Sequence, residues 1–291
     1  MMDTITHTLF GAGLYKASNK ERMNKKEKYA LLFTAIGASQ IPDSDVISQL
    51  WDTAGYYQMW HRGITHSVFL VPFWALLFYI LSWIFFKVKD VKLFYTALIG
   101  VFIHDTSDVF NAWGTGYLEP FTSERLTLGT VSIIDFVIWF IFLISFIVSK
   151  TQSSLKEKAI YRTAWIVICL HIFIQSAQGY ILYNQYKPGY DHVALSASFV
   201  PWHFSVIGKN GETVDIIKDS LITKPALQYR LKSSENSAAL KTLFKQNPKA
   251  RTLYQWSPFV VMVDTKEKLG IYDPRFYKDG ESFLFEFMEK K

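Results

Sequence analysis

The chain has 291 residues, of which half are hydrophobic and 17% are aromatic, and its formal net charge is +6. A mean hydropathy of +0.11 is too high for an ordinary soluble enzyme of this size. The one cysteine, Cys169, excludes an intrachain disulfide, and the apolar run around it indicates a small packing residue. Composition therefore favours a membrane-associated protein of one or two domains.

Apolar runs of two lengths follow one another in the first hundred residues. Thr4 to Tyr15, Tyr29 to Ile41 and Leu93 to Ile103 are short, which favours half-spanning, re-entrant or packing helices. The uncharged run from Ser67 to Phe86 is long enough to cross a hydrocarbon core of roughly 30 Å at about 1.5 Å per residue. We predict a transmembrane helix there.

Two later runs also have the length of a span. Val131 to Ser149 is interrupted by Asp135, and Thr163 to Asn184 carries His171 and Gln175. These polar side chains are expected to face protein or water, His171 as an interhelical hydrogen bonder. The predicted fold class is therefore an α-helical multi-pass membrane domain with about three full spans plus short re-entrant or packing helices.

The composition changes after residue 184, where long apolar runs end and sixteen Lys and Arg stand against twelve Asp and Glu. Alternating patterns in Val193 to Phe199 and His203 to Ile217 indicate strands, and Asn210-Gly211 predicts a hairpin. We predict two domains, residues 1–184 in the membrane and residues 185–291 as a small soluble α+β domain. Its other expected elements are a helix over Ser237 to Lys245, a strand over Leu253 to Asp264 and a pair of strands around Leu269 to Phe276 and Ser282 to Met288.

Basic residues predict the orientation. Up to residue 183 there are fifteen Lys and Arg, and thirteen of them lie in three connections, Lys16 to Lys28, Lys87 to Lys92 and Lys150 to Arg162. Such connections belong in the cytoplasm. The expected localisation is the cell membrane, multi-pass, with the ionisable motifs and the C-terminal domain on the extracytoplasmic side.

Histidine and aspartate gather in four short motifs beside the apolar runs. Imidazole and carboxylate are the ligands from which hydrolytic metal sites are built, and ionisable groups against membrane helices are costly unless they have a function. The motifs are THT with His7, PDSD with Asp43 and Asp45, HRGITHS with His61 and His66, and HDTSD with His104, Asp105 and Asp108.

Spacing separates the roles within two motifs. His104 and Asp108 are four residues apart, so one helix face presents both to one metal ion. Asp105 would point to a second metal ion or make a hydrogen bond behind the ligands. His61 and His66 are about 140° apart on an ideal helix, so they converge only if Arg62-Gly63 forms a turn.

Structural interpretations stay open for several of these residues. Asp43 and Asp45 follow Pro42 in an expected loop, where they either bind a cation or cap a helix. His7 is either a ligand or a hydrogen bonder at a helix start. Arg125 and Asp135 form a structural ion pair, or Arg125 holds an anionic group by a bidentate contact. His192 and His203 are expected to be surface or packing residues.

The order of the motifs, with HRGITHS before an apolar run and HDTSDVFNAWGT before an EPF…R…D stretch, resembles the membrane-bound metal-dependent hydrolases of the YdjM type. The longer YfhP-like members are most similar, and the resemblance covers about residues 1 to 150. An alternative description of this family as LexA-binding implies a regulatory role. The metal-site positions that the resemblance implies are His7, Asp43, Asp45, His61, His66, His104 and Asp108, with Arg125 and Asp135 in support.

The sequence therefore predicts a membrane-bound metal-dependent hydrolase. One or two divalent cations, zinc or manganese, would activate water. Asp105 or a spare histidine would be the general base and Arg125 would bind an anionic leaving group, with Arg62 and Asp135 as supporting residues. The expected substrate is a phosphoester or another lipid-linked compound at the outer leaflet.

Two other classes of function remain as alternatives. A non-catalytic membrane protein could bind a regulator or another protein partner, with metal or ion pairs serving only its structure. A transporter would need more spans than the sequence offers. Nucleic-acid binding has little support, because membrane orientation accounts for the basic residues of the first half.

Overall fold

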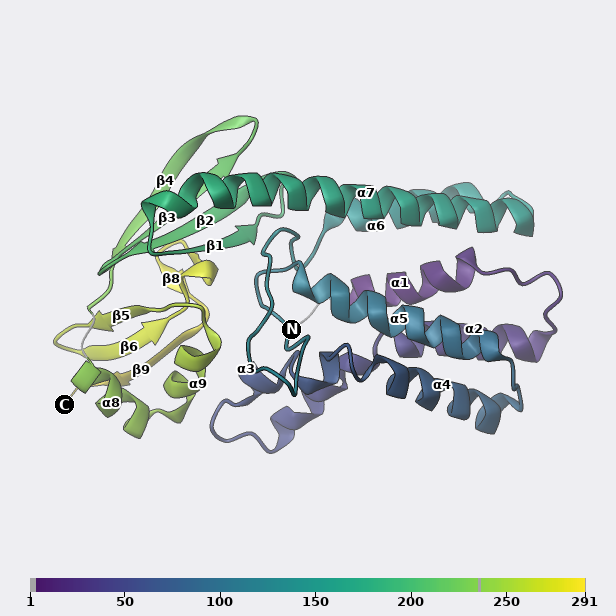
Figure 1. Cartoon of the computed structure of the whole chain (residues 1–291), viewed down its shortest axis with the longest axis horizontal. Helices are drawn as coiled ribbons and strands as arrows, with labels where there is room; N and C mark the ends of the chain where they lie inside the picture. Colours follow the sequence, from purple (N-terminus) through teal and green to yellow (C-terminus); the bar gives the residue numbers. More distant parts are fainter. Residues whose placement is uncertain (1–3, 235–236, 291) are drawn as a thin grey trace. The chain divides into compact units, whose positions relative to one another are not determined.

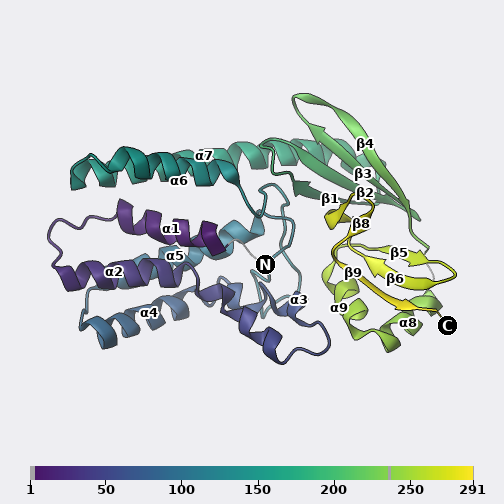
Figure 2. The same cartoon turned by 180° about the vertical axis from the view of Figure 1, so that it is seen from behind.

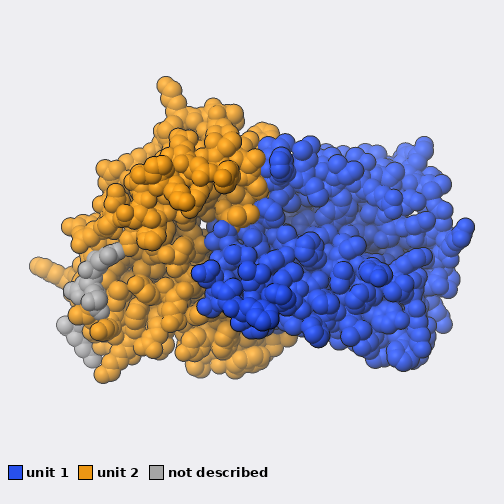
Figure 3. All heavy atoms as spheres, in the orientation of Figure 1, with its two compact units in different colours: residues 1–45, 62–127, 132–174 blue, residues 46–61, 128–131, 175–291 orange. Residues whose placement is uncertain are grey.

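A computed structural model describes residues 4–234 and 237–290. The chain forms two compact units that are interleaved along the sequence, as Figure 3 colours them. The first contains residues 1–45, 62–127 and 132–174, and the second contains residues 46–61, 128–131 and 175–291. The sequence-based division had a single boundary, between residues 184 and 185. In the structure, the second unit also includes the short segments 46–61 and 128–131.

The first unit is a layer of helices (Figure 1). Helix α2 packs against α1, α4 and α5, and α6 packs against α1. Gly11 lets α1 and α2 approach closely, because a Cβ there would lie 2.7 Å from the carbonyl oxygen of Ala35. The helices are α1 (Thr4–Ala17), α2 (Lys25–Ala38), α4 (Val71–Phe86), α5 (Val91–Val109), α6 (Phe136–Ser149) and the first part of α7 (Ser154–Tyr186).

Short elements connect these helices. The 3₁₀ helix η1 (Ile41–Leu50) carries Asp43 and Asp45, which the sequence placed in a loop. Helix α3 (Tyr57–Trp60) and the 3₁₀ turn η2 (Ile64–His66) follow. Arg62 has a left-handed φ of 58°, which provides the turn between the two histidines of HRGITHS.

The prediction of about three full membrane spans is wrong. Within the described residues, one helix is long and apolar enough to cross a membrane, the segment Ser154–Gly189 that contains α7. The predicted span from Ser67 to Phe86 is not one helix, since Ser67 is extended and α4 begins only at Val71. It gives a second crossing only if α4 and Tyr57–His66, which meet at 74°, count as one broken span.

Helix α6 is also shorter than the run that predicted it. Asp135 does not interrupt a helix but caps one, because its side chain accepts hydrogen bonds from the backbone amides of Val137 and Ile138. The 14 residues that remain extend about 21 Å, less than the roughly 30 Å of a hydrocarbon core. Hydropathy alone does not show where a helix begins, and here caps and turns shortened two of the three expected spans.

Large apolar side chains nevertheless cover the outside of several helices. Phe73 on α4, Phe140 on α6 and Phe173 on α7 are all exposed. Exposed side chains of this size and apolar character suit contact with lipid.

The second unit is rich in β-structure (Figure 2). Its largest sheet is an antiparallel meander in the order β1-β2-β3-β4, followed by a three-stranded sheet in the order β5-β6-β9 and the pair β7-β8. The strands are β1 (His192–Ala197), β2 (Phe204–Asn210), β3 (Thr213–Ser220), β4 (Thr223–Lys232), β5 (Val261–Asp264), β6 (Lys268–Tyr272), β7 (Tyr277–Lys278), β8 (Glu281–Ser282) and β9 (Phe285–Glu289). Two short 3₁₀ turns, η3 (Lys187–Gly189) and η4 (Pro274–Phe276), complete it with helices α8 (Ser237–Gln246) and α9 (Pro248–Trp256).

Local signals explain which predictions succeed in this unit. The hairpin at Asn210-Gly211 is confirmed, with Asn210 paired to Thr213 and a left-handed φ of 53° at Gly211. The strand expected from Leu253 is wrong over its first residues. Asn247 caps α9 through its side chain and Pro248 occupies the first turn, so a helix begins here, and it extends to Trp256.

Candidate metal centre

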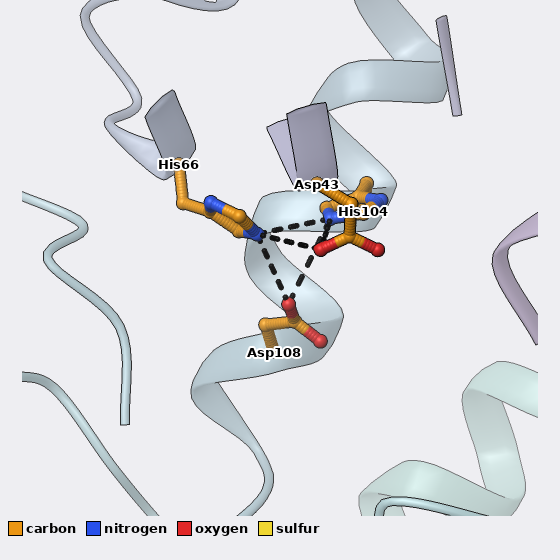
Figure 4. A group of neighbouring side chains, drawn as sticks. All are labelled: Asp43, His66, His104 and Asp108. Carbon is orange, nitrogen blue, oxygen red and sulfur yellow. Dashed lines mark hydrogen bonds and ion pairs between the residues drawn. The ribbon is translucent and has the colours of Figure 1, made fainter. Parts of the chain in front are cut away.

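Four side chains from three elements converge in the first unit (Figure 4). Asp43 comes from η1, His66 from η2, and His104 and Asp108 from consecutive turns of α5. One ligand atom of each lies within 4.8 Å of the others. As the four-residue spacing predicted, His104 and Asp108 lie on one face of α5, with His104 Nε2 3.7 Å from Asp108 Oδ2.

The distances within this group suit one cation. The Nε2 atoms of His66 and His104 are 3.1 Å apart. Asp43 Oδ1 lies 3.4 Å from His66 Nε2 and 3.7 Å from His104 Nε2, and Asp108 Oδ2 lies 3.4 and 3.7 Å from the same two atoms. A tetrahedral site with metal–ligand bonds of about 2.0–2.1 Å has edges of about 3.3–3.4 Å. The four atoms therefore fit around a single metal ion.

Hydrogen bonds fix which nitrogen of His104 carries the proton. Its Nδ1 lies 2.8 Å from the carbonyl oxygen of Ser39. A carbonyl oxygen only accepts, so Nδ1–H donates to it and the neutral ring presents the lone pair of Nε2 to the site. Metal-binding histidines are usually held in this way.

His66 is oriented by a carboxylate. Its Nδ1 lies 3.0 Å from Thr65 Oγ1 and 3.5 Å from Asp45 Oδ2. Thr65 donates its own proton to Asp45 across 3.1 Å, which leaves its oxygen to accept from His66 Nδ1–H. The Nε2 lone pair of His66 thus faces that of His104, and a cation between the two nitrogens would relieve their repulsion.

Positive charge stabilises the carboxylates from the protein side. Arg62 Nε lies 3.1 Å from Asp108 Oδ2, and its Nη1 donates to Asn111 Oδ1 across 2.5 Å. Burial by itself raises the pKa of Asp108, but Arg62 and the neighbouring histidines lower it well below its usual range. The nearby imidazoles of His104 and His66 likewise outweigh burial and lower the pKa of Asp43. Both groups are therefore ionised and able to bind a cation.

Asp105 has a different environment from its neighbours. It is fully buried, and within the described residues neither of its oxygens accepts a hydrogen bond. Burial raises the pKa of this carboxyl well above its usual value. It lies outside the group of four.

Two other predicted ligands lie behind the group. The ring of His7 stacks on that of His104 with centroids 3.7 Å apart, and its Nε2 is 3.5 Å from Asp108 Oδ1. Asp45 contacts His66 and accepts a hydrogen bond from the backbone amide of Arg62 across 2.9 Å. The structure thus places both beside ligands.

The remaining predicted residues have other contacts. His61 belongs to the second unit, where its buried ring stacks on Tyr57 at 5.0 Å. Arg125 Nη2 donates to the carbonyl oxygen of Gly114 across 2.9 Å. Asp135 Oδ2 accepts a hydrogen bond from His171 Nε2 at 2.9 Å, which confirms His171 as an interhelical hydrogen bonder.

Sequence reasoning missed three residues that support the ligands. Asn111 lies three residues after Asp108, just past the end of α5, and its side chain accepts a hydrogen bond from Arg62. Thr65 lies inside HRGITHS and mediates between Asp45 and His66. Ser39 contributes its backbone carbonyl, for which no side-chain pattern exists.

Comparison with known proteins agrees with the motifs. The family described as YdjM inner membrane protein matches residues 2–182, and the chain belongs to this family. It is also 30% identical over 138 residues to the protein named "Uncharacterized protein YfhP" of Bacillus subtilis (strain 168). That match covers 46% of this chain and 42% of the relative, so it spans less than half of either protein. No solved structure matches.

Proposed function

We propose that this member of the YdjM inner membrane protein family is a membrane-bound metal-dependent hydrolase. The observation that carries the proposal is the convergence of two imidazole lone pairs and two ionised carboxylates on one point. Two nitrogen and two oxygen ligands suit zinc or manganese. A bound ion would lower the pKa of a water molecule and polarise the scissile group.

The protein's own side chains support this assignment in distinct ways. Asp43 has a side chain that is 15% exposed, against at most 4% for the other three, so water and substrate would reach the site beside it. A hydrolytic site needs one open position, and Asp43 is the ligand least held by its surroundings. Asp105 would exchange a proton with the attacking water, because its buried oxygens accept no hydrogen bond from the described residues.

The substrate class is part of the proposal. A phosphoester or another lipid-linked compound fits a membrane-bound metal site, and Arg125 would hold its anionic group. The basic segment Lys150 to Arg162 at the start of α7 favours a cytoplasmic position for that end of the helix. Residues after α7 would then be extracytoplasmic, and substrate would come from the outer leaflet.

Metal content tests the site directly. We expect stoichiometric zinc or manganese in protein purified from membranes and its loss in His66→Ala and His104→Ala. The matched control is His192→Ala, because this exposed histidine of β1 belongs to no candidate ligand group among the described residues. Metal-free protein that hydrolyses a phosphoester as fast as the metal-loaded form would refute the proposal.

A structural metal site in a regulatory or partner-binding membrane protein is the second candidate. Four protein ligands with little exposure are typical of closed, structural zinc sites. The variant Asp105→Asn distinguishes the two candidates, since Asp105 is not among the four ligands. A hydrolase would lose turnover and keep its metal, whereas a structural site would leave every function of the protein unchanged.

A further inference from the structure

The β1–β4 sheet ends in an exposed apolar rim outside the part of the chain that the family covers. The rim consists of two connections, residues 198–203 between β1 and β2 and residues 221–222 between β3 and β4. Both turn at the same end of the antiparallel sheet, because Phe204 pairs with Asp219. Its apolar members are between 44 and 71% exposed, and they are Phe199, Val200, Trp202, Leu221 and Ile222.

The rim is attached to the helix that can cross a membrane. The backbone amide of Trp202 donates a hydrogen bond to Gln175 Oε1 of α7 across 3.1 Å. Gln175 lies inside the apolar segment of that helix, and the surrounding surface of α7 is itself apolar, with Phe173 and Tyr180 both exposed. The rim therefore lies beside the part of α7 around Gln175, where the exposed side chains of the helix are apolar.

The last turns of α7 are fixed to the same sheet. Tyr183 and Tyr186 pack against the buried cluster of Leu195, Val206 and Ile217. Figures 1 and 2 both show the β1–β4 sheet beside this end of the helix. Because helix and sheet form one body here, the rim cannot change its level without moving α7.

Charge at the rim matches a lipid surface. Lys218 and Lys224 are exposed on either side of the turn at residues 221–222. Tryptophan and phenylalanine favour the boundary between headgroups and acyl chains, and lysines beside them are attracted to anionic lipids. We propose that the apolar rim is a membrane-docking surface that inserts into the headgroup boundary of the bilayer that α7 enters.

This surface gives the second unit a defined function. Docking at the rim would hold the sheet against the bilayer instead of leaving it free on a single helix. The inference depends on neither a metal ion nor hydrolase activity, so it can fail or succeed independently of the proposed function.

Depth-dependent fluorescence quenching tests the docking surface in the full chain. Cys169→Ser provides the background for two single-cysteine variants at exposed rim positions, Phe199→Cys and Ile222→Cys. The matched control is Glu212→Cys in the exposed β2–β3 turn, at the opposite end of the sheet. Each protein is labelled with an environment-sensitive fluorophore and reconstituted into phosphatidylcholine–phosphatidylglycerol vesicles with brominated acyl chains.

We expect several-fold stronger quenching at both rim positions than at residue 212. Equal quenching at all three positions would overturn the inference. Shielding of the rim labels that needs no lipid and rises with protein concentration would also overturn it, since a second copy would then cover the rim. Replacing Lys218 and Lys224 together by glutamate should reduce rim quenching in these vesicles, and unchanged quenching would contradict the attraction to anionic lipid.

Discussion

At the residue scale, the candidate metal centre depends on groups that lie behind the four candidate ligands. Asp45 and the Ser39 carbonyl determine the tautomers of His66 and His104. Arg62 faces Asp108 and keeps a buried carboxylate ionised. Removing such partners typically lowers metal affinity without removing any ligand.

Asp45→Asn should therefore lower metal affinity about 10–100-fold, while one ion still binds at saturation. The physical reason is that an amide accepts the Thr65 hydroxyl proton less strongly than a carboxylate does, so Thr65 Oγ1 holds His66 Nδ1–H less firmly. Competition with a chelator of known affinity measures the change. Asp90→Asn is the control, because Asp90 only caps the start of α5, and equal affinities for both variants would contradict the role of Asp45.

At the scale of elements, Gly129 lets the loop 128–131 approach the backbone of β1 closely within the second unit. Gly129 has a φ of +62°, and a Cβ there would lie 1.9 Å from the carbonyl oxygen of Leu195. Gly211 has a similar φ of +53° with nothing within 4 Å. The two glycines share the backbone conformation and differ only in the space beside them.

Gly129→Ala should lower the free energy of unfolding by about 2–5 kcal/mol, from left-handed strain plus overpacking. Gly211→Ala should cost only the strain, about 1–2 kcal/mol. Thermal unfolding of the purified full chain measures both changes. Equal losses would mean that the close approach to β1 does not contribute.

An ion pair links β3 to β4. Asp215 accepts hydrogen bonds from Arg230 Nε at 2.8 Å and Nη2 at 3.0 Å, and from the Tyr190 hydroxyl at 2.9 Å. These contacts, led by that with Arg230, lower the pKa of Asp215 in the folded chain. Its stabilising effect is thus complete above the unfolded pKa of about 3.9 and is lost as the pH falls through the lower folded value.

Asp215→Asn should therefore unfold at a lower temperature than the parent at neutral pH, and the difference should shrink as the pH falls below about 4. Unfolding temperatures measured across this range check the prediction. The exposed Asp279 supplies the control, Asp279→Asn. A difference that grows in acid would reverse the assigned sign.

At the scale of the whole molecule, α7 is the helix of the described residues that is long and apolar enough to cross a membrane. Ile166 lies nine residues before Gln175 on this helix, about 14 Å deeper than the rim at 1.5 Å per residue, and 68% of its surface is exposed. Ile166→Arg should weaken insertion by about 2.5–3.5 kcal/mol, the cost of a charge at the centre of a spanning helix. The fraction of protein that resists alkaline extraction of membranes measures this loss, and Tyr254→Arg on the exposed face of α9 should leave that fraction unchanged.

The sequence by itself indicated the residue types of the candidate site, the shared helix face of His104 and Asp108, the hairpin at Asn210-Gly211 and the family. Each of these depends on local geometry, which spacing and backbone preference encode within a few residues. The resemblance to the YdjM family also rested on contiguous motifs, and the family match confirms it.

Tertiary structure decided which carboxylates meet the histidines and which apolar runs become long helices. Asp43 and Asp45 are equivalent in the sequence, yet one faces both Nε2 atoms and the other holds His66 from behind. The spans expected at Ser67 and Val131 were shortened by an extended serine and by the cap at Asp135. The cap at Asp135 is a local contact, but the side that each carboxylate faces depends on partners far away in the chain, because direction and burial arise only when the elements pack together.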